Sequence, residues 1–492
     1  MSRNNVLRML AMVLDMLGVG FLVAPRNSAR KPEPEKAPVR PGVVRMIGVH
    51  GGDFWGSSVS TYFFGDSLIA FTRDARWFGF LRDRAFELDG ESPERGHPLE
   101  KQLIIYDLTG PAKVPTERLN AGHGPLASGP HGSIAFYVKD PFQEARLFFP
   151  NVAPAPGGND PAAAPEPPDI PEYVAVHWCE PGHTAYYRLP KHSGPRIRSQ
   201  GTIRQLWFGI NPGTKKPCLF ALRIDGLLCM WELRDGGRPP RGNVRVKDAP
   251  RTINLFTSFG LKPQDCIGIP LSVAPSTGMI AFDDFRASAI RVIPLSPPHK
   301  PRTLQPVPDD DPASGSTELL LSADGRYCLR LRDLPQEART QEADVVAVRG
   351  PNVLDMWNTE KGTFLWRQKL PETSYISRVA FRPDGLRFVT WSGDRFSKFV
   401  LQDHAFPVPG DPPSADRRIP AAREKLETVT PESGTLHLWD SAKGTVVGTL
   451  PFALSDWPTA LHFTPDGAQV VVLTPDGVCH FADTQAFRMP GG

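Results

Sequence analysis

Short apolar stretches separated by polar turns recur along most of the chain, and the pattern is clearest near the C-terminus. Thr435–Asp440 is a strand-like stretch that is followed by Gly444 and then by a second apolar stretch ending at Gly467. Val478–Asp483 repeats the first stretch after about 42 residues, counted from Trp439. A period of about this length, with four short strands per unit, is typical of β-propeller blades.

From Val43 onward the chain can be divided into seven such units, which predicts an all-β, seven-bladed β-propeller over residues 43–492. Each unit should contain four strands, a to d. In the first unit, Val59–Phe64, Ser67–Phe71 and Gln102–Asp107 are the expected strands a, b and c. The chain ends soon after strand c of the last unit, so residues 43–49 are predicted to supply the missing strand and close the ring.

Two further patterns repeat with the units. Pro383-Asp384-Gly385 and Pro465-Asp466-Gly467 predict tight turns between strands a and b, because Pro presets φ, Asp bonds the local backbone and Gly adopts positive φ. A large aromatic side chain in strand c is expected to fill the wedge between neighbouring blades rather than to stack on a cofactor. These aromatic residues are Tyr106, Trp178, Trp231, Trp357, Trp439 and Phe481.

Leu436–Asp440, Leu228–Glu232 and Phe381–Gly385 resemble the strand c and turn motifs of WD40-repeat proteins. The resemblance covers almost the whole predicted ring. It implies a seven-bladed propeller that acts as a non-enzymatic scaffold for protein–protein interaction. The Gly-His pair of that family is retained only loosely, at Gly122-His123, so its hydrogen-bonded tetrad of His, Ser or Thr, Asp and Trp is expected to be incomplete in most blades.

Four long insertions interrupt the units, and all of them fall between strands b and c. Consecutive strands of a blade are antiparallel, so b–c and d–a connections leave the ring on the same face. Long loops held by a rigid scaffold are where binding residues tend to lie, and this face is therefore predicted to bind another protein. Solvated spacers without a partner are the alternative. The insertions are residues 73–101, 139–171, 332–351 and 393–434.

Composition supports a globular chain with many turns, since 40% of its 492 residues are hydrophobic and 53 are Pro. A net charge of +3 gives no overall attraction to nucleic acid. Residues 188–251 nevertheless hold fourteen Lys or Arg against four Asp or Glu. This basic patch either attracts an anionic partner or consists of solvated loops, and it lacks the interleaved aromatic residues of single-strand binding. Its candidate residues are Lys215, Lys216, Arg238, Arg241, Arg245 and Lys247.

No catalytic or metal-binding motif is present: the chain has no H-E-x-x-H, G-x-S-x-G, P-loop or C-x-x-C sequence. No cofactor is therefore expected. A hydrolase or lyase whose site converges from several blades on the central channel remains the alternative. Cys218 and Cys229 either form a disulfide across a hairpin or remain buried thiols. Asp309–Asp311 is an acidic run in a connection, where a solvated turn is favoured over a cation site.

The N-terminal segment leaves the compartment open. Arg3 and Arg8 precede Met9–Ala24, an apolar run interrupted by Asp15 and shorter than the ~20 residues of a membrane span. Residues 1–24 are either an export or anchoring segment, which allows membrane association through residues 9–24, or a helix with no part in the fold. Residues 25–42 are a Pro-rich linker that is expected to be disordered. The composition and irregular repeats favour a bacterial, monomeric protein.

Overall fold

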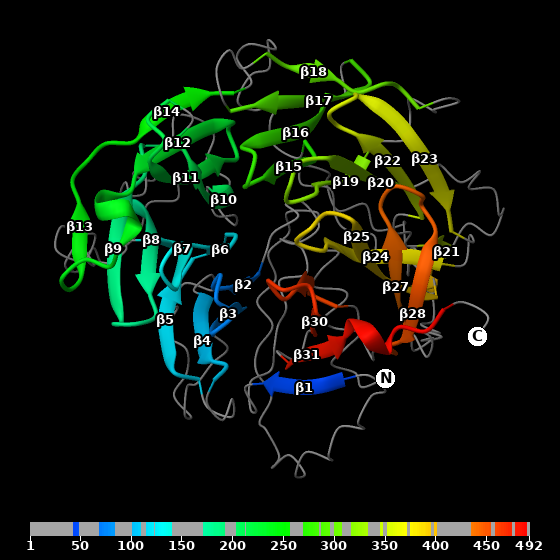
Figure 1. Ribbon diagram of the computed structural model, residues 1–492, viewed down its shortest axis with the longest axis horizontal. Coiled ribbons are helices and arrows are strands. Elements are labelled where there is room, and N and C mark those ends of the chain that lie inside the picture. Colours follow the sequence, from blue (N-terminus) through cyan, green and yellow to red (C-terminus); the bar gives the residue numbers. More distant parts are fainter. Residues whose placement is uncertain are drawn as a thin grey trace, which may run out of the picture.

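A computed structural model of the chain shows seven sheets arranged around an axis (Figure 1). Residues 1–42, with the expected anchor segment and linker, lie outside the part that the structure describes. The described residues are 43–48, 68–83, 101–109, 115–122, 124–139, 171–191, 203–211, 213–255, 269–284, 287–295, 300–307, 316–332, 345–347, 352–370, 374–394, 398–400, 434–453, 458–474 and 478–489.

The first four blades follow one another along the chain, each with strand a nearest the axis and strands b, c and d successively further out (Figure 1). Blade 1 consists of β2 (Ile69–Phe71), β3 (Trp77–Asp83), β4 (Lys101–Asp107) and β5 (Glu117–Ala121). Blade 2 consists of β6 (Ala127–Ser128), β7 (Ser133–Lys139), β8 (Glu172–Trp178) and β9 (His183–Arg188), with β13 (Val244–Val246) as a fifth strand. Blade 3 consists of β10 (Ile203–Ile210), β11 (Pro217–Arg223), β12 (Leu227–Glu232) and β14 (Arg251–Asn254), with the short 3-10 turn η2 (Arg234–Gly237) after β12. Blade 4 consists of β15 (Leu271–Ala274), β16 (Met279–Asp284), β17 (Ala289–Pro294) and β18 (Arg302–Thr303).

The last three blades complete the ring. Blade 5 consists of β19 (Ser316–Leu321), β20 (Tyr327–Arg332), β22 (Val353–Asn358) and β23 (Thr363–Lys369). Blade 6 consists of β24 (Ser374–Phe381), β25 (Arg387–Asp394), β27 (Thr435–Asp440) and β28 (Val446–Pro451). Blade 7 consists of β29 (Ala460–Phe463), β30 (Gln469–Leu473), β31 (Val478–Asp483) and β1 (Val43–Gly48), followed by the 3-10 turn η5 (Thr484–Ala486). Two further strands, β21 (Val345–Ala347) and β26 (Lys398–Val400), pair outside the blades.

The N-terminal strand closes the ring, as the sequence predicted. β1 pairs antiparallel with β31 and supplies the outer strand of blade 7, with Met46 opposite His480 and Gly48 opposite Val478. The first and last described strands of the chain therefore share one sheet (Figure 1). The prediction of an all-β, seven-bladed propeller closed in this way is confirmed.

A hydroxyl group and a carboxylate hold the turn between strands a and b in several blades. In blade 7, Thr464 Oγ1 donates to Asp466 Oδ1 (2.6 Å) and accepts from Gln469 N (3.0 Å), and Asp466 Oδ1 also accepts from Ala468 N (3.0 Å). Blade 6 retains the carboxylate alone, since Asp384 Oδ1 accepts from Leu386 N (3.0 Å). The same pairs recur in blades 1 and 5 as Thr72–Asp74 and Ser322–Asp324.

Ala75 occupies the position of these turns that Gly fills elsewhere. Its φ is 55°, against 70° for Gly385 and 69° for Gly467. Ala75 therefore adopts a left-handed backbone conformation, which is sterically unfavourable for a residue with a Cβ. Replacing Ala75 with Gly is expected to raise the free energy of unfolding by about 0.5–1 kcal/mol, measured by urea denaturation. The reverse change, Gly467→Ala, should destabilise, because its Cβ would also lie 2.8 Å from the Cγ of Arg382. A lower stability of the Ala75→Gly variant would contradict this account of the turn.

Apolar side chains from adjacent blades form the core between the sheets. The indole of Trp439 stacks on Phe388, with 5.8 Å between ring centroids. Its Nε1 donates to Thr390 Oγ1 (2.9 Å), which is the Trp to Ser or Thr link of the tetrad that the WD40 resemblance implied. All six aromatic residues predicted for strand c are buried: Tyr106, Trp178, Trp231, Trp357, Trp439 and Phe481.

The six aromatic residues do not all face the same neighbour. Trp357 and Trp439 pack against the preceding blade, whereas Trp178 and Phe481 pack against the following one. The pairing register explains the difference in blade 7, where Ala482, and not Phe481, takes the position that Trp439 has in blade 6. A shift of one residue moves a side chain to the other face of a strand.

The expected strands of the first blade are wrong. Strand a is β2, which lies within the range expected for strand b, and strand b is β3, which lies within the range 73–101 expected for an insertion. The connection between β3 and β4 is therefore residues 84–100. The segment Val59–Phe64 lies outside the described residues. The cause is that Trp77–Leu81 is a short, fully buried apolar stretch without polar alternation, and charged residues flank it on both sides.

Candidate functional site

The two faces of the ring carry different connections. Because strands a to d are antiparallel, the b–c and d–a connections share one face, called here the b–c face, and the a–b and c–d connections share the other, the a–b face. The long connections 84–100, 140–171, 333–352 and 395–434 all join strand b to strand c, so both ends of each lie on the b–c face. Most of their residues, and Asp309–Asp311, lie outside the described part of the chain.

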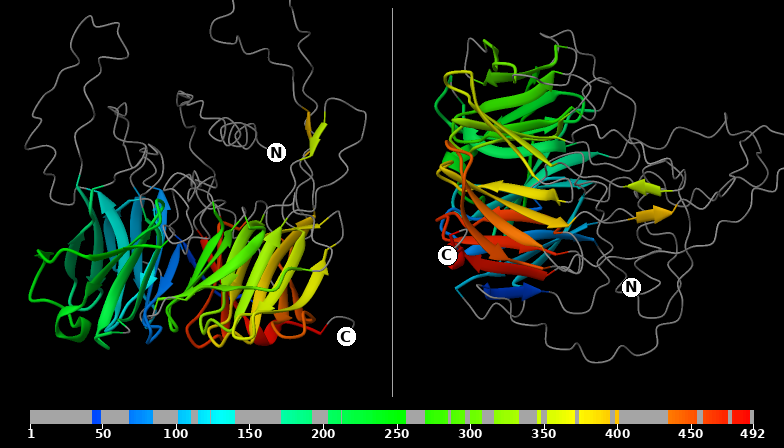
Figure 2. Two further views of the ribbon diagram at one scale, coloured as in Figure 1. Left: turned by 90° about the horizontal axis from the view of Figure 1, so that it is seen from above. Right: turned by 90° about the vertical axis from the view of Figure 1, so that its right-hand side faces the viewer.

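Two of these connections meet. β21 belongs to the b–c connection of blade 5 and β26 to that of blade 6, and they pair antiparallel, with Val345 opposite Val400 and Ala347 opposite Lys398. This two-stranded ribbon stands off the ring on the b–c side (Figure 2). Neighbouring connections therefore build one shared structural element above the ring.

A buried ion cluster lies in blade 5, in the half of the sheet nearer the b–c face. The Asp355 side chain is fully buried and contacts three arginines from strands b and d. Arg330 Nη2 lies 2.8 Å from Oδ2, Arg367 Nε lies 2.6 Å from Oδ1, and Arg332 Nε lies 3.5 Å from Oδ2. This cluster was not predicted from the sequence, although a lone acid inside the apolar stretch Val353–Trp357 is a signal of it.

Strand ends at the b–c face carry buried polar groups in other blades as well. Arg223, at the end of β11, pairs with Asp225 (2.9 Å) and donates from Nη1 to Pro190 O (2.7 Å) in the d–a connection of blade 2. In blade 4, Asp284 at the end of β16 lies 3.3 Å from Arg291 Nε. These side chains have partners within the fold, so they fix the strand ends from which the connections leave the ring.

Two residues of opposite charge lie near the axis. Glu318 on β19 and Arg378 on β24 are half-buried residues of neighbouring inner strands, and Arg378 Nε donates to Thr459 O in blade 7 (2.8 Å). Burial raises the pKa of Glu318 to about 7, although the charge of Arg378 acts in the opposite direction. Glu318 therefore changes its charge near neutral pH.

The raised pKa of Glu318 predicts a pH-dependent stability. The folded state holds the proton of Glu318 up to about pH 7, whereas the unfolded state releases it near pH 4.5, so stability falls as pH rises between these values. Glu318→Gln is expected to raise the free energy of unfolding at pH 8 by about 1–3 kcal/mol and to change it little at pH 4.5, measured by urea denaturation. The exposed Glu360→Gln serves as the control. An equal effect of Glu318→Gln at both pH values would contradict the assignment.

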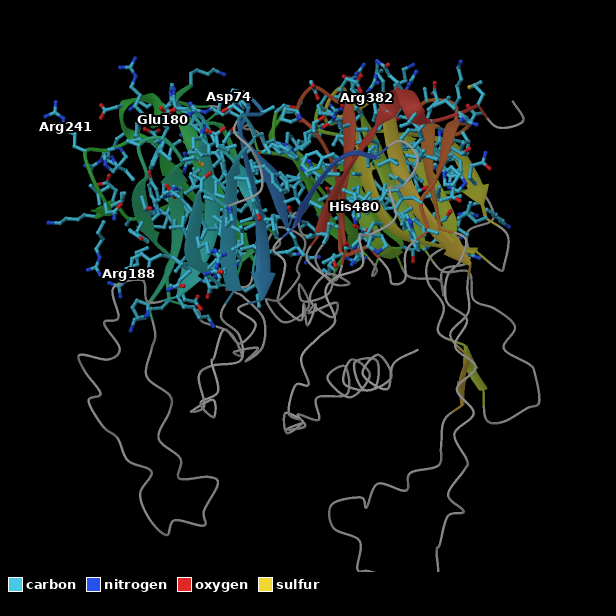
Figure 3. All side chains as sticks on the ribbon, turned by 90° about the horizontal axis from the view of Figure 1, so that it is seen from below. Asp74, Glu180, Arg188, Arg241, Arg382 and His480 are labelled. Atoms are coloured by element: carbon cyan, nitrogen blue, oxygen red, sulfur yellow. The ribbon has the colours of Figure 1, made fainter. Side chains whose placement is uncertain are left out.

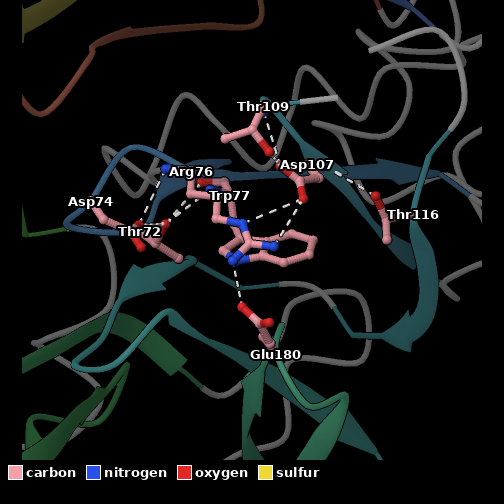
Figure 4. A network of polar contacts seen from close by, with 8 residues as sticks. All are labelled: Thr72, Asp74, Arg76, Trp77, Asp107, Thr109, Thr116 and Glu180. Atoms are coloured by element: carbon pink, nitrogen blue, oxygen red, sulfur yellow. Dashed lines mark hydrogen bonds and ion pairs between the residues drawn. The ribbon is translucent and has the colours of Figure 1, made fainter. Parts of the chain in front are cut away.

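On the a–b face, an ion pair joins turns of blades 1 and 2. Arg76, in the a–b turn of blade 1, lies 3.3 Å from Asp107 Oδ2 in the same blade and 2.5 Å from Glu180 Oε2 in blade 2 (Figure 4). Asp107 in turn accepts from Thr109 N (2.9 Å), and the Arg76 guanidinium lies 4.9 Å from the Trp77 ring. Arg76 therefore links the a–b turn of blade 1 to the c–d turn of blade 2, and its charge is matched by acids of the fold.

The basic patch that the sequence predicted is divided in the structure. Lys215 and Lys216 lie in the a–b turn of blade 3, where Lys216 Nζ is 3.1 Å from Glu232 Oε2. The remaining residues lie in the c–d connection of the same blade, which crosses to the outer edge of blade 2. Figure 3 places Arg241 of this connection at the outer margin of the ring. These remaining residues are Arg238, Arg241, Arg245 and Lys247.

The described residues hold no group of three or more His, Cys, Asp or Glu that is positioned to bind a metal ion. Burial lowers the pKa of His437 and His462. Cys218 and Cys229 are free thiols, which excludes the disulfide between them, and burial raises their pKa values to about 11 and about 12. No helix among the described residues has the length and apolar character needed to cross a membrane.

No protein family's sequence profile matches this chain, and no curated protein matches it in sequence. Solved structures with a similar fold include U3-55K, at 11% identity and a TM-score of 0.46 over 90% of this chain and 99% of that one. The RRP9 WD40 repeats are 10% identical with a TM-score of 0.46, over 92% and 99% of the two chains. A chain of the mitotic checkpoint complex is 9% identical with a TM-score of 0.44, over 93% and 99%. The assignment of this chain as a seven-bladed propeller rests on its own strand pairing.

Proposed function

We propose that this protein is a non-enzymatic propeller scaffold that binds another protein through its b–c face. The observation that carries the proposal is the ribbon formed by β21 and β26, in which connections from two adjacent blades build one element above the ring. The buried polar groups at the strand ends support it, because they fix the roots of those connections on a rigid scaffold.

The size of the ribbon favours a binding role. Each of its strands is three residues long, and the ribbon has no third strand among the described residues. A two-stranded sheet of this size is marginally stable alone in water, and it gains stability when a further strand or surface packs against it. An extended segment of a partner protein can add to such an edge through main-chain hydrogen bonds.

Proline substitutions in the ribbon test the proposal. Val346→Pro and Phe399→Pro together remove backbone donors from opposed positions of β21 and β26 without touching a blade. We expect the variant to keep the thermal stability of the ring and to lose the partners that the unmodified protein captures from native cells, quantified by mass spectrometry.

The matched control changes exposed residues of the opposite face, Lys361→Ala and Leu386→Ala, and should retain the captured partners. An unchanged set of partners for the ribbon variant would refute the proposal. Loss of the same partners by the a–b face variant would move the binding site to that face.

A further inference from the structure

The connection between β12 and β14, called here the strap (residues 233–250), ties blade 3 to blade 2. Its strand β13 pairs parallel with β9, the outer strand of blade 2, with Val244 opposite Ala185 and Val246 opposite Tyr187. Trp178 Nε1 donates to Gly237 O (3.0 Å), and Thr184 N donates to the Asn243 side chain (2.8 Å). The strap is therefore a fixed part of the outer wall (Figure 1).

The strap presents a row of cationic side chains to solvent. Arg238, Arg241, Lys247 and the adjoining Arg251 are exposed, and none of them has a carboxylate partner among the described residues. The strap contains two acids, Asp235 and Asp248, and Asp248 is paired with Arg234 at 2.8 Å. An uncompensated positive strip on a rigid backbone favours an anionic partner.

The strip runs along an extended stretch of backbone that includes β13, which suits an extended polypeptide as its partner. Exposure alternates along β13, where Val244 and Val246 are half-buried while Arg245 and the following Lys247 face solvent, and residues 248, 249 and 251 are exposed as well. The cations at 241, 247 and 251 are separated by six and four residues. An extended acidic peptide carries carboxylates about 6.6 Å apart on one side, so it can place one near each of these cations. Residues 233–254 include no aromatic side chain on which a nucleic-acid base would stack.

We propose that the strap and Arg251 form a docking surface for an acidic, extended segment of a partner protein. This surface lies on the outer wall of blades 2 and 3 and is separate from the b–c face. The cations at 241, 247 and 251 pair with carboxylates of the bound segment, and the pairing of β13 with β9 fixes the strap that carries Arg241 and Lys247. The proposal does not depend on the function of the ribbon.

Peptide binding by the full-length protein tests the proposal. The probe is a fluorescein-labelled peptide of roughly twelve residues in which Glu alternates with Thr, which spans about 40 Å when extended. Its binding is followed by fluorescence anisotropy at low and at physiological salt. We expect saturable binding that weakens with salt, and the substitutions Arg241→Ala, Lys247→Ala and Arg251→Ala together should weaken it about tenfold or more.

The control removes the same charge from exposed lysines of blades 5 and 6, through Lys361→Ala, Lys369→Ala and Lys443→Ala, and should change the affinity less than about twofold. The same peptide with Gln in place of Glu should not bind. Equal weakening by both triple variants would overturn the proposal, because binding would then follow net charge alone. Tighter binding of a DNA duplex or single strand through the same residues would overturn it in favour of nucleic acid, and absence of saturable peptide binding would also overturn it.

Discussion

A chain that begins at residue 50, and therefore lacks β1, is expected to be several kcal/mol less stable than the full-length protein and to self-associate. β1 pairs with β31 from Val43 to Gly48, and its loss removes the backbone hydrogen bonds of that ladder, each contributing about 1 kcal/mol net. The deletion also leaves the edge of β31 open to another chain, which is a known route to aggregation and strand exchange. Thermal unfolding and size-exclusion chromatography measure both effects.

A chain that begins at residue 42 is the control for this deletion. It keeps β1 and should retain the melting temperature and the elution volume of the full-length protein. Met46→Pro gives a milder version of the same effect, because proline removes a donor from the middle of β1. If the chain beginning at residue 50 unfolded at the same temperature as the control, the ring would not depend on closure by β1.

Those parts of the fold that local residue chemistry determines could be predicted. The positive φ of Gly385 and Gly467 follows from their position after Asp in a tight turn, and closure followed from a missing outer strand in the last unit. The aromatic residues of strand c could be predicted because they recur. Which neighbouring blade Trp178 and Phe481 pack against could not be predicted. Register depends on pairing with a neighbouring strand, and a one-residue difference reverses the face.

The candidate surfaces depend on pairings that join distant segments. β13 belongs by sequence to blade 3 and by hydrogen bonding to blade 2. β21 pairs with β26 although four strands, β22 to β25, separate them in the sequence. Such pairings have no local signature, because each strand is only three residues long. The positive charge of the strap could nevertheless be predicted from the sequence. Lys215 and Lys216, which the sequence placed in the same patch, lie apart from the strap in a turn beside Glu232.

Asp355→Asn is expected to reduce the free energy of unfolding by about 3–5 kcal/mol, because it removes the negative charge that balances three arginines in the interior of blade 5. The side chain of Arg332 is 1% exposed and that of Arg330 is 9% exposed, so neither cation can be rehydrated without opening the sheet. Equilibrium urea denaturation measures the change, and circular dichroism shows whether the variant still folds.

Asp248→Asn is the matched control, since it makes the same chemical change in an exposed pair. The side chains of Arg234 and Asp248 are 71% and 60% exposed, and water replaces the lost interaction, so the cost should stay below about 1 kcal/mol. A second variant, Asp355→Asn with Arg367→Met, should recover part of the lost stability, because it removes one of the cations left without its charge partner. If Asp355→Asn cost no more than Asp248→Asn, the cluster would not be a buried charge balance, and its arginines would have to be compensated by other groups.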